Sequence, residues 1–168
     1  MCIRDSASTI DAVAQPDDAI VLVGPGQRED LARFYKGPLR IVELPQQPVD
    51  RDATIRHLEQ LAGEHRRLYA VYRASEVNDP QGIVNGWLST HTAATADQWL
   101  RNVRVVTNAA PHSTGDWPVQ DSSAGFDGQI QLRQVARSAE SVRAGDMLVL
   151  RTDWQALVQP KADYSLFV

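Results

Sequence analysis

The sequence has little cysteine and no long apolar run. Cys2 is the one cysteine among 168 residues, so no internal disulfide can form, and cysteine usage does not indicate the redox environment. The longest clean apolar run, residues 19–23, is far shorter than the roughly 18 residues of a membrane span. The charged start is not followed by the apolar segment of a signal peptide. The chain as printed therefore predicts a water-exposed globular region.

Clustered positive charge and metal-ligand spacings are also missing. The net charge is -4 and the pI about 5.5, which argues against nucleic acid as a partner because phosphate binding relies on clustered Lys and Arg. The one dense basic spot, residues 65–67, follows a helical pattern, where cations complement the helix dipole. None of the four histidines has a Cys, His or carboxylate partner at a zinc-ligand spacing. The sequence thus implies no metal and no cofactor.

Residues 7–108 alternate between short apolar runs and segments of helical spacing. Strands are predicted at residues 19–23, 39–44, 68–72 and 103–107. Helices are predicted before Pro16, over residues 27–36, after Asp50 or Asp52, and from Asp79 onward. This order predicts an α/β domain with a small Rossmann-like, mostly parallel sheet and flanking helices.

The period changes in the last third of the chain. Residues 109–125 are rich in turn formers and are predicted to be a linker. Apolar residues then alternate with polar ones over residues 126–132, 148–154 and 164–168, with a turn at residues 144–146. This pattern predicts an antiparallel β-sandwich domain over residues 126–168. A sandwich core needs about seven strands and about 100 residues, so we expect it to be incomplete, with an uncovered apolar face.

A glycine-rich turn gives the first candidate binding site. Gly24, Gly26, Gln27 and Arg28 follow a buried strand and precede a helix, which is where dinucleotide sites place the pyrophosphate. The third glycine of that motif is missing, and two acidic residues at 29–30 put negative charge where a phosphate would lie. The pattern favours a structural turn, with binding of a nucleotide or sugar phosphate as the alternative.

Glu76 and Asp79 give the second candidate. They follow the third predicted strand, at the sheet edge where open α/β sheets bind ligands. An Asp-Pro pair before a helical pattern is also typical of a helix start, and we favour that role for Asp79. Ser89 lacks the strand-turn-helix context of a catalytic serine. We predict no catalytic residue.

The four tryptophans offer a third possibility, a carbohydrate-binding β module. Trp87, Trp99 and Trp154 lie in amphipathic patterns and are predicted to belong to the core. Trp117 lies in the predicted linker and should be the most exposed. A sugar could stack on Trp117 or Trp154, unless both indoles are buried.

Several phrases occur in an order that resembles a known family. They are DDAIVLVGPGQ, FY before GP, ELP, RRLYAVYRASEVNDP, WL and WLRNVRV, followed by FDGQIQL, VRAGDMLVL, TDWQA and DYSLFV. The order is similar to the C-terminal extracytoplasmic region of bacterial polytopic membrane glycosyltransferases, those like the family 39 dolichyl-phosphate-mannose protein mannosyltransferases. Each phrase is loose, and the order of the set carries the resemblance.

The resemblance implies a parent enzyme in the cell membrane that transfers a sugar from a polyprenyl-phosphate donor. Its catalytic groups would lie in the membrane helices and their first extracytoplasmic loop, so no catalytic residue is carried over to this chain. The region printed here would lie on the extracytoplasmic side. Its partners would be its own membrane domain and a glycan or acceptor substrate. The alternative is a stand-alone ligand-binding module.

The two ends support the interpretation as a fragment. MCIRDS, residues 1–6, has no evident period and looks like the translation of a sequencing adaptor, in which case Cys2 has no biological role. At the other end, the alternating pattern is still running at Val168. We therefore expect the natural protein to extend beyond this chain at both ends.

Overall fold

The computed structural model describes residues 2–110, 117–142 and 148–159 of the chain. The chain divides into two compact units, Met1–His112 and Ser113–Val168, each built on its own sheet. In chain order the first unit contains α1 (Cys2–Asp11), β1 (Asp18–Val23), α2 (Arg28–Ala32), β2 (Arg40–Leu44), α3 (Arg51–Glu64), β3 (Arg67–Tyr72), α4 (Ser75–Asn78), α5 (Ile83–His91), β4 (Ala93–Leu100) and β5 (Val103–Ala109).

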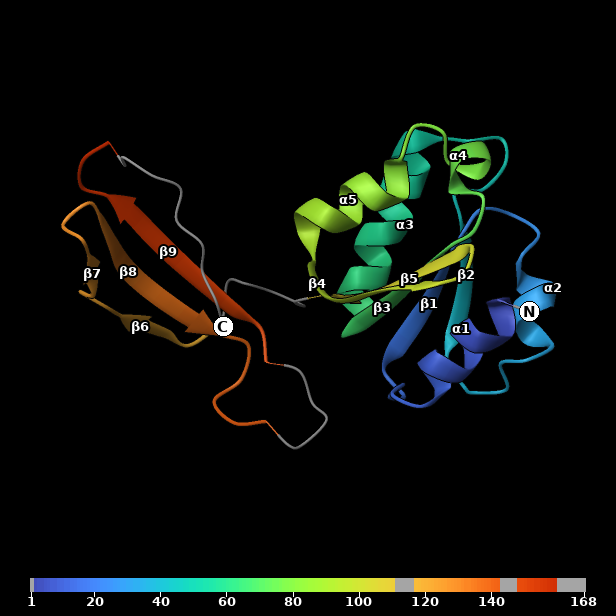
Figure 1. Cartoon of the computed structure of the whole chain (residues 1–168), viewed down its shortest axis with the longest axis horizontal. Coiled ribbons are helices and arrows are strands. Elements are labelled where there is room, and N and C mark those ends of the chain that lie inside the picture. The colour runs from blue at the N-terminus through green and yellow to red at the C-terminus, as the bar shows by residue number, and fades with distance from the viewer. Residues whose placement is uncertain (1, 111–116, 143–147, 160–168) are drawn as a thin grey trace. The chain divides into compact units, whose positions relative to one another are not determined.

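The sheet of the first unit confirms the α/β prediction. Its strand order is β2-β1-β3-β5-β4, and β1 pairs in parallel with both β2 and β3. Helices α3 and α5 lie on one face and α1 and α2 on the other (Figure 1). The central strand β1 is buried on both faces, with Ala19, Val21 and Val23 facing α3 and α5, and Ile20 and Leu22 facing the opposite way.

The edge of this sheet formed by β5 and β4 differs from the prediction. The expected fourth strand exists as β5, but it runs antiparallel to β3 and forms a hairpin with β4. Two residues, Arg101 and Asn102, join β4 to β5, and a link that short permits only an antiparallel pair. Strand β4 was not predicted, because its sequence AATADQWL is exposed along nearly its whole length and has no apolar alternation.

Helix α1 corrects a second expectation. Residues 1–6 were expected to lack helical structure, but the helix begins at Cys2. Ile3, Ala7 and Ile10 recur at helical spacing and are buried beneath it. The adaptor origin of these letters stays a prediction. None of the helices within the described ranges is long and apolar enough to span a membrane.

The second unit contains β6 (Val119–Asp121), β7 (Gly125–Phe126), β8 (Ile130–Arg137) and β9 (Leu150–Ala156). Strand β8 pairs antiparallel with the other three, which confirms an antiparallel sheet after residue 126. The segment predicted to be a linker, residues 109–125, contains β6 and the start of β7. The expected third run at residues 164–168, the turn at residues 144–146, and His112 lie outside the described residues.

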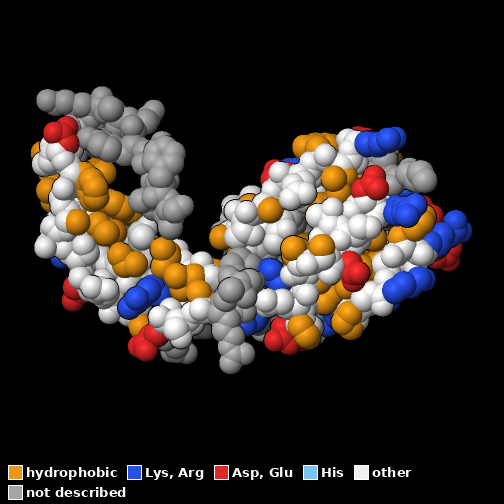
Figure 2. Space-filling view, turned by 60° about the horizontal axis from the view of Figure 1, so that its bottom comes forward, with side chains coloured by type: hydrophobic (Ala, Val, Ile, Leu, Met, Phe, Trp, Pro, Cys, Tyr) orange, Lys and Arg blue, Asp and Glu red, His pale blue; other side chains and the backbone are white. Residues whose placement is uncertain are grey.

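One face of this second sheet carries apolar side chains that are exposed or half-buried. Directly paired residues share a face, so Phe126 and Ile130 lie together, as do Leu132 and Trp154. Among the described apolar residues of this unit, Ala136 alone is buried. Hydrophobic side chains gather on the visible surface of this unit in Figure 2.

Candidate functional site

The glycine-rich turn after β1 already contains an anion. Oε1 of Glu43, at the end of β2, accepts hydrogen bonds from the backbone N–H of Gln27 at 2.8 Å and of Arg28 at 2.9 Å. These are the donors that would hold a phosphate at such a turn. An external anion would have to displace this carboxylate. The residues predicted for this site lie together in one turn. The N–H groups of Gln27 and Arg28, however, are already bound by the Glu43 carboxylate.

Gln27 and Gly24 have structural roles at the same turn. The Gln27 side chain is 5% exposed, and its Nε2 donates to the carbonyl groups of Val23 at 3.0 Å and Arg73 at 3.2 Å. It thereby links the carboxyl ends of β1 and β3. Gly24 has φ +118°, and a Cβ there would lie 2.5 Å from the Asn78 side chain. The conformation and the contact both require glycine.

An open cleft of about 860 Å³ lies at the carboxyl end of β3. Glu76 and Asp79, the second predicted pair, both line it. The position agrees with the rule that open α/β sheets bind ligands beyond the carboxyl ends of their parallel strands. Its other walls include the side chains of Tyr72, Asn85, Trp99, Asn102 and Arg104.

Asp79 is a helix cap, as favoured, but the helix that it caps begins farther along the chain than expected. Its side chain is buried, and its two oxygens accept from the N–H groups of Ile83 and Val84, each at 2.9 Å. Helix α5 begins at Ile83 rather than at Pro80, because Gly82 turns the chain with φ +61°. At the start of the same loop, Ala74 is left-handed (φ 49°), an uncommon state for a residue with a Cβ. The two turns place α4 and α5 around the cleft.

Arg104 is held firmly in the cleft wall. Its Nε and Nη2 donate to the two carboxylate oxygens of Asp97 at 3.0 and 2.7 Å, a bidentate pair. Its guanidinium lies over the Tyr72 ring, 5.5 Å from the centroid. These hydrogen bonds hold the pKa of the Asp97 carboxyl below its usual range. The pair fixes the orientation of Arg104 beside the open space.

Trp99 forms an exposed aromatic wall next to Arg104. The two residues are directly paired across the β4–β5 hairpin and so share the face of the sheet that carries Tyr72. The prediction that Trp99 belongs to the core is wrong: it is 68% exposed and lies on β4, an edge strand of the sheet. Arg104, Asn85 and Asn102 were also missed, since their closeness depends on that hairpin.

The other tryptophans divide between core and surface. Trp87 is buried, as predicted, and stacks on His91 with ring centroids 4.5 Å apart. The core prediction for Trp154 is wrong, since it is 38% exposed and contacts Phe126 on the uncovered sheet face. Trp117 was expected to be the most exposed and is only half-buried, less exposed than Trp99.

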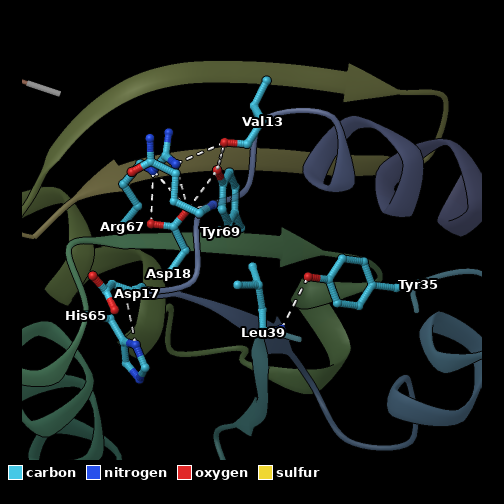
Figure 3. Close-up of polar contacts among 9 residues, drawn as sticks. Val13, Asp17, Asp18, Tyr35, Leu39, His65, Arg67 and Tyr69 are labelled. Carbon is cyan, nitrogen blue, oxygen red and sulfur yellow. Dashed lines mark hydrogen bonds and ion pairs between the residues drawn. The ribbon is translucent and has the colours of Figure 1, made fainter. Parts of the chain in front are cut away.

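A buried charged cluster lies at the opposite, amino-terminal edge of the parallel strands. Asp18 and Arg67 form an ion pair at 2.7 Å with side chains 1% and 11% exposed, and the Tyr69 hydroxyl donates to Asp18 at 3.3 Å (Figure 3). Arg67 also donates to the carbonyl of Val13. These hydrogen bonds and the ion pair join β1, β3 and the turn that follows α1, which is a structural role.

The known proteins supply no assignment for this site. No protein-family model, curated protein or solved structure matches the chain. The resemblance to family 39 glycosyltransferases therefore rests on the order of the sequence phrases. No group of His, Cys, Asp and Glu within the described ranges could hold a metal ion. Of the described residues lining the cleft, none is His or Cys.

Proposed function

We propose that this chain is the non-catalytic, extracytoplasmic part of a membrane glycosyltransferase that uses a polyprenyl-phosphate sugar donor. In this proposal it packs against its own membrane domain and docks a glycan or acceptor in the β3 cleft. The sequence phrases support the first part. The cleft supports the second, and one observation carries it: the exposed indole of Trp99 stands beside the anchored guanidinium of Arg104.

A glycan suits this pair of walls. The C–H face of a sugar ring packs on an aromatic ring, while its hydroxyl groups need both donors and acceptors. The cleft supplies donors from Arg104, donors and acceptors from Asn85 and Asn102, and an acceptor from Glu76. Sites of this kind combine apolar surface with a few fixed polar groups.

Binding is tested by titrating the protein with a panel of neutral glycans, with Trp154→Ala as the matched control for Trp99→Ala. Loss of an aromatic contact costs about 1–1.5 kcal/mol, so Trp99→Ala should weaken binding by about tenfold. Trp154→Ala should leave it unchanged. The reverse result would favour the carbohydrate-binding β module, and binding unaffected by either variant would exclude both sites.

The non-catalytic role is tested with a polyprenyl-phosphate sugar and an acceptor. The isolated chain should release no transferred product, because the proposal assigns the chemistry to the membrane domain. Sugar transfer by the isolated chain would overturn the proposal.

A further inference from the structure

The two arginines of the cleft are already neutralised. Arg104 forms its bidentate pair with Asp97, with the shortest contact at 2.7 Å. Arg73 pairs with Asp30 at 3.0 Å. Neither guanidinium therefore offers an unmatched positive charge, although each keeps N–H groups that can donate to a neutral oxygen.

The two carboxylates that line the cleft, Glu76 and Asp79, have no such partner of opposite charge among the described residues. Asp79 is buried and takes two backbone N–H groups, which are dipoles rather than cations. Glu76 is exposed and, among the residues that the structure describes, forms no ion pair. With both arginines compensated, the charged groups lining the cleft leave an excess of negative charge at Glu76 and Asp79.

We infer that the cleft selects its glycan by charge: it takes a neutral hexopyranose and disfavours a sugar that carries a carboxylate or phosphate. This inference rests on the proposed glycan docking. Glu76 accepts a hydrogen bond from a sugar hydroxyl, the asparagines and Arg104 bind further hydroxyls, and Trp99 packs on the ring. A carboxylate on the same ring would meet Glu76 at short range without a free cation to offset it.

The expected preference is modest because Glu76 is exposed. Interactions between solvent-exposed charges at contact distance change an equilibrium by up to about fivefold and weaken as salt is added. A preference of this origin must therefore decrease with ionic strength. A preference caused by shape would not.

The experiment compares methyl glucopyranoside with methyl glucuronopyranoside, which differ at one carbon, in titrations followed by NMR of the intact chain. The native protein should bind the neutral sugar up to about fivefold more tightly, and added salt should narrow the gap. Glu76→Gln keeps an acceptor and removes the exposed charge, so it should reduce the preference. Glu59→Gln, an exposed carboxylate of α3 outside the cleft, should retain it.

The outcomes separate the inference from the proposed function. Equal or tighter binding of the glucuronide, or an unchanged preference in Glu76→Gln, overturns the charge selection and leaves glycan docking standing. Binding of neither sugar, nor of any neutral glycan in the panel, overturns the docking and the selection together.

Discussion

Oε1 of Glu43 lies 2.8 Å from the backbone nitrogen of Gln27 and accepts its N–H. Glu43, the penultimate residue of β2, thus places its carboxylate at the point where a phosphate would bind the turn after β1. A strand, a glycine-rich turn and a helix are all present, but the turn is closed by a group of the same chain. Sequence patterns of this kind indicate a nucleotide site only when the N–H groups are free.

The native protein should show no thermal stabilisation by nucleotides or by inorganic phosphate. Glu43→Ala should lower the free energy of unfolding by about 1–3 kcal/mol, since it leaves two N–H groups without their charged acceptor. Glu43→Gln keeps an acceptor oxygen and should cost less. Denaturant unfolding and thermal-shift measurements check both statements. Clear stabilisation of the native protein by inorganic phosphate would contradict the internal-anion interpretation.

The two glycines of this turn should differ in their response to alanine. Gly24→Ala adds a Cβ that meets Asn78 at 2.5 Å and also strains a φ of +118°, so we expect a loss of about 3 kcal/mol. Gly26→Ala, at φ +77° with no atom within 4 Å, should cost about 1–2 kcal/mol. Equal losses in chemical denaturation would show that Asn78 moves aside freely.

The buried ion pair between Asp18 and Arg67 should dominate the charge contributions to stability. Arg67→Ala leaves a buried carboxylate without its cation, and we expect a loss of about 3–5 kcal/mol. Arg40→Ala breaks an exposed pair with Glu64 and should cost less than about 1 kcal/mol. Urea unfolding of the two variants measures the difference. Similar values would mean that water reaches the Asp18 side chain.

Alkaline pH should destabilise the protein through two tyrosines. Burial raises the pKa of Tyr69 and of Tyr72 to about 12, from an ordinary value of 10.0. The folded state therefore holds protons that the unfolded state releases between pH 10 and pH 12. Stability is complete below pH 10 and falls as the pH rises through that window, by about 1.4 kcal/mol per pKa unit for each tyrosine.

Tyr72→Phe should make this alkaline fall shallower. The absorbance of tyrosinate, followed together with circular dichroism, measures ionisation and unfolding in the same sample. Ionisation of both tyrosines near pH 10 in the folded protein would contradict the burial argument.

The sequence predicts the first half of the fold well because its central strands are continuous apolar runs. Residues 19–23 fit a strand buried on both faces of a sheet, and β1 is buried throughout. Of the two residues predicted as caps, Asp50 and Asp52, it is Asp50 that caps α3, accepting from the N–H of Ala53. Strand β4 could not be found in this way, because an exposed edge strand needs no apolar face and its pairing is decided by β5.

The candidate site could be predicted only in part, because some of its residues follow recognisable strands and others do not. Glu76 and Asp79 follow a recognisable strand, so their position at the ligand-binding edge could be inferred. Trp99 and Arg104 reach that edge only through the β4–β5 hairpin, and Arg104 faces Tyr72 through the pairing of β5 with β3. The direction of β5 decides which of its ends meets the cleft, and periodicity carries no information about direction.

The side chain of Asp79 joins the cleft to the start of α5 through the amides of Ile83 and Val84. These two amide protons can exchange with solvent only when that carboxylate releases them. We expect a molecule bound in the cleft to slow that release, and an empty cleft to allow it. The hydrogen-exchange rates of Ile83 and Val84 should therefore report whether the cleft is occupied. They can be followed in deuterated water without attaching a probe.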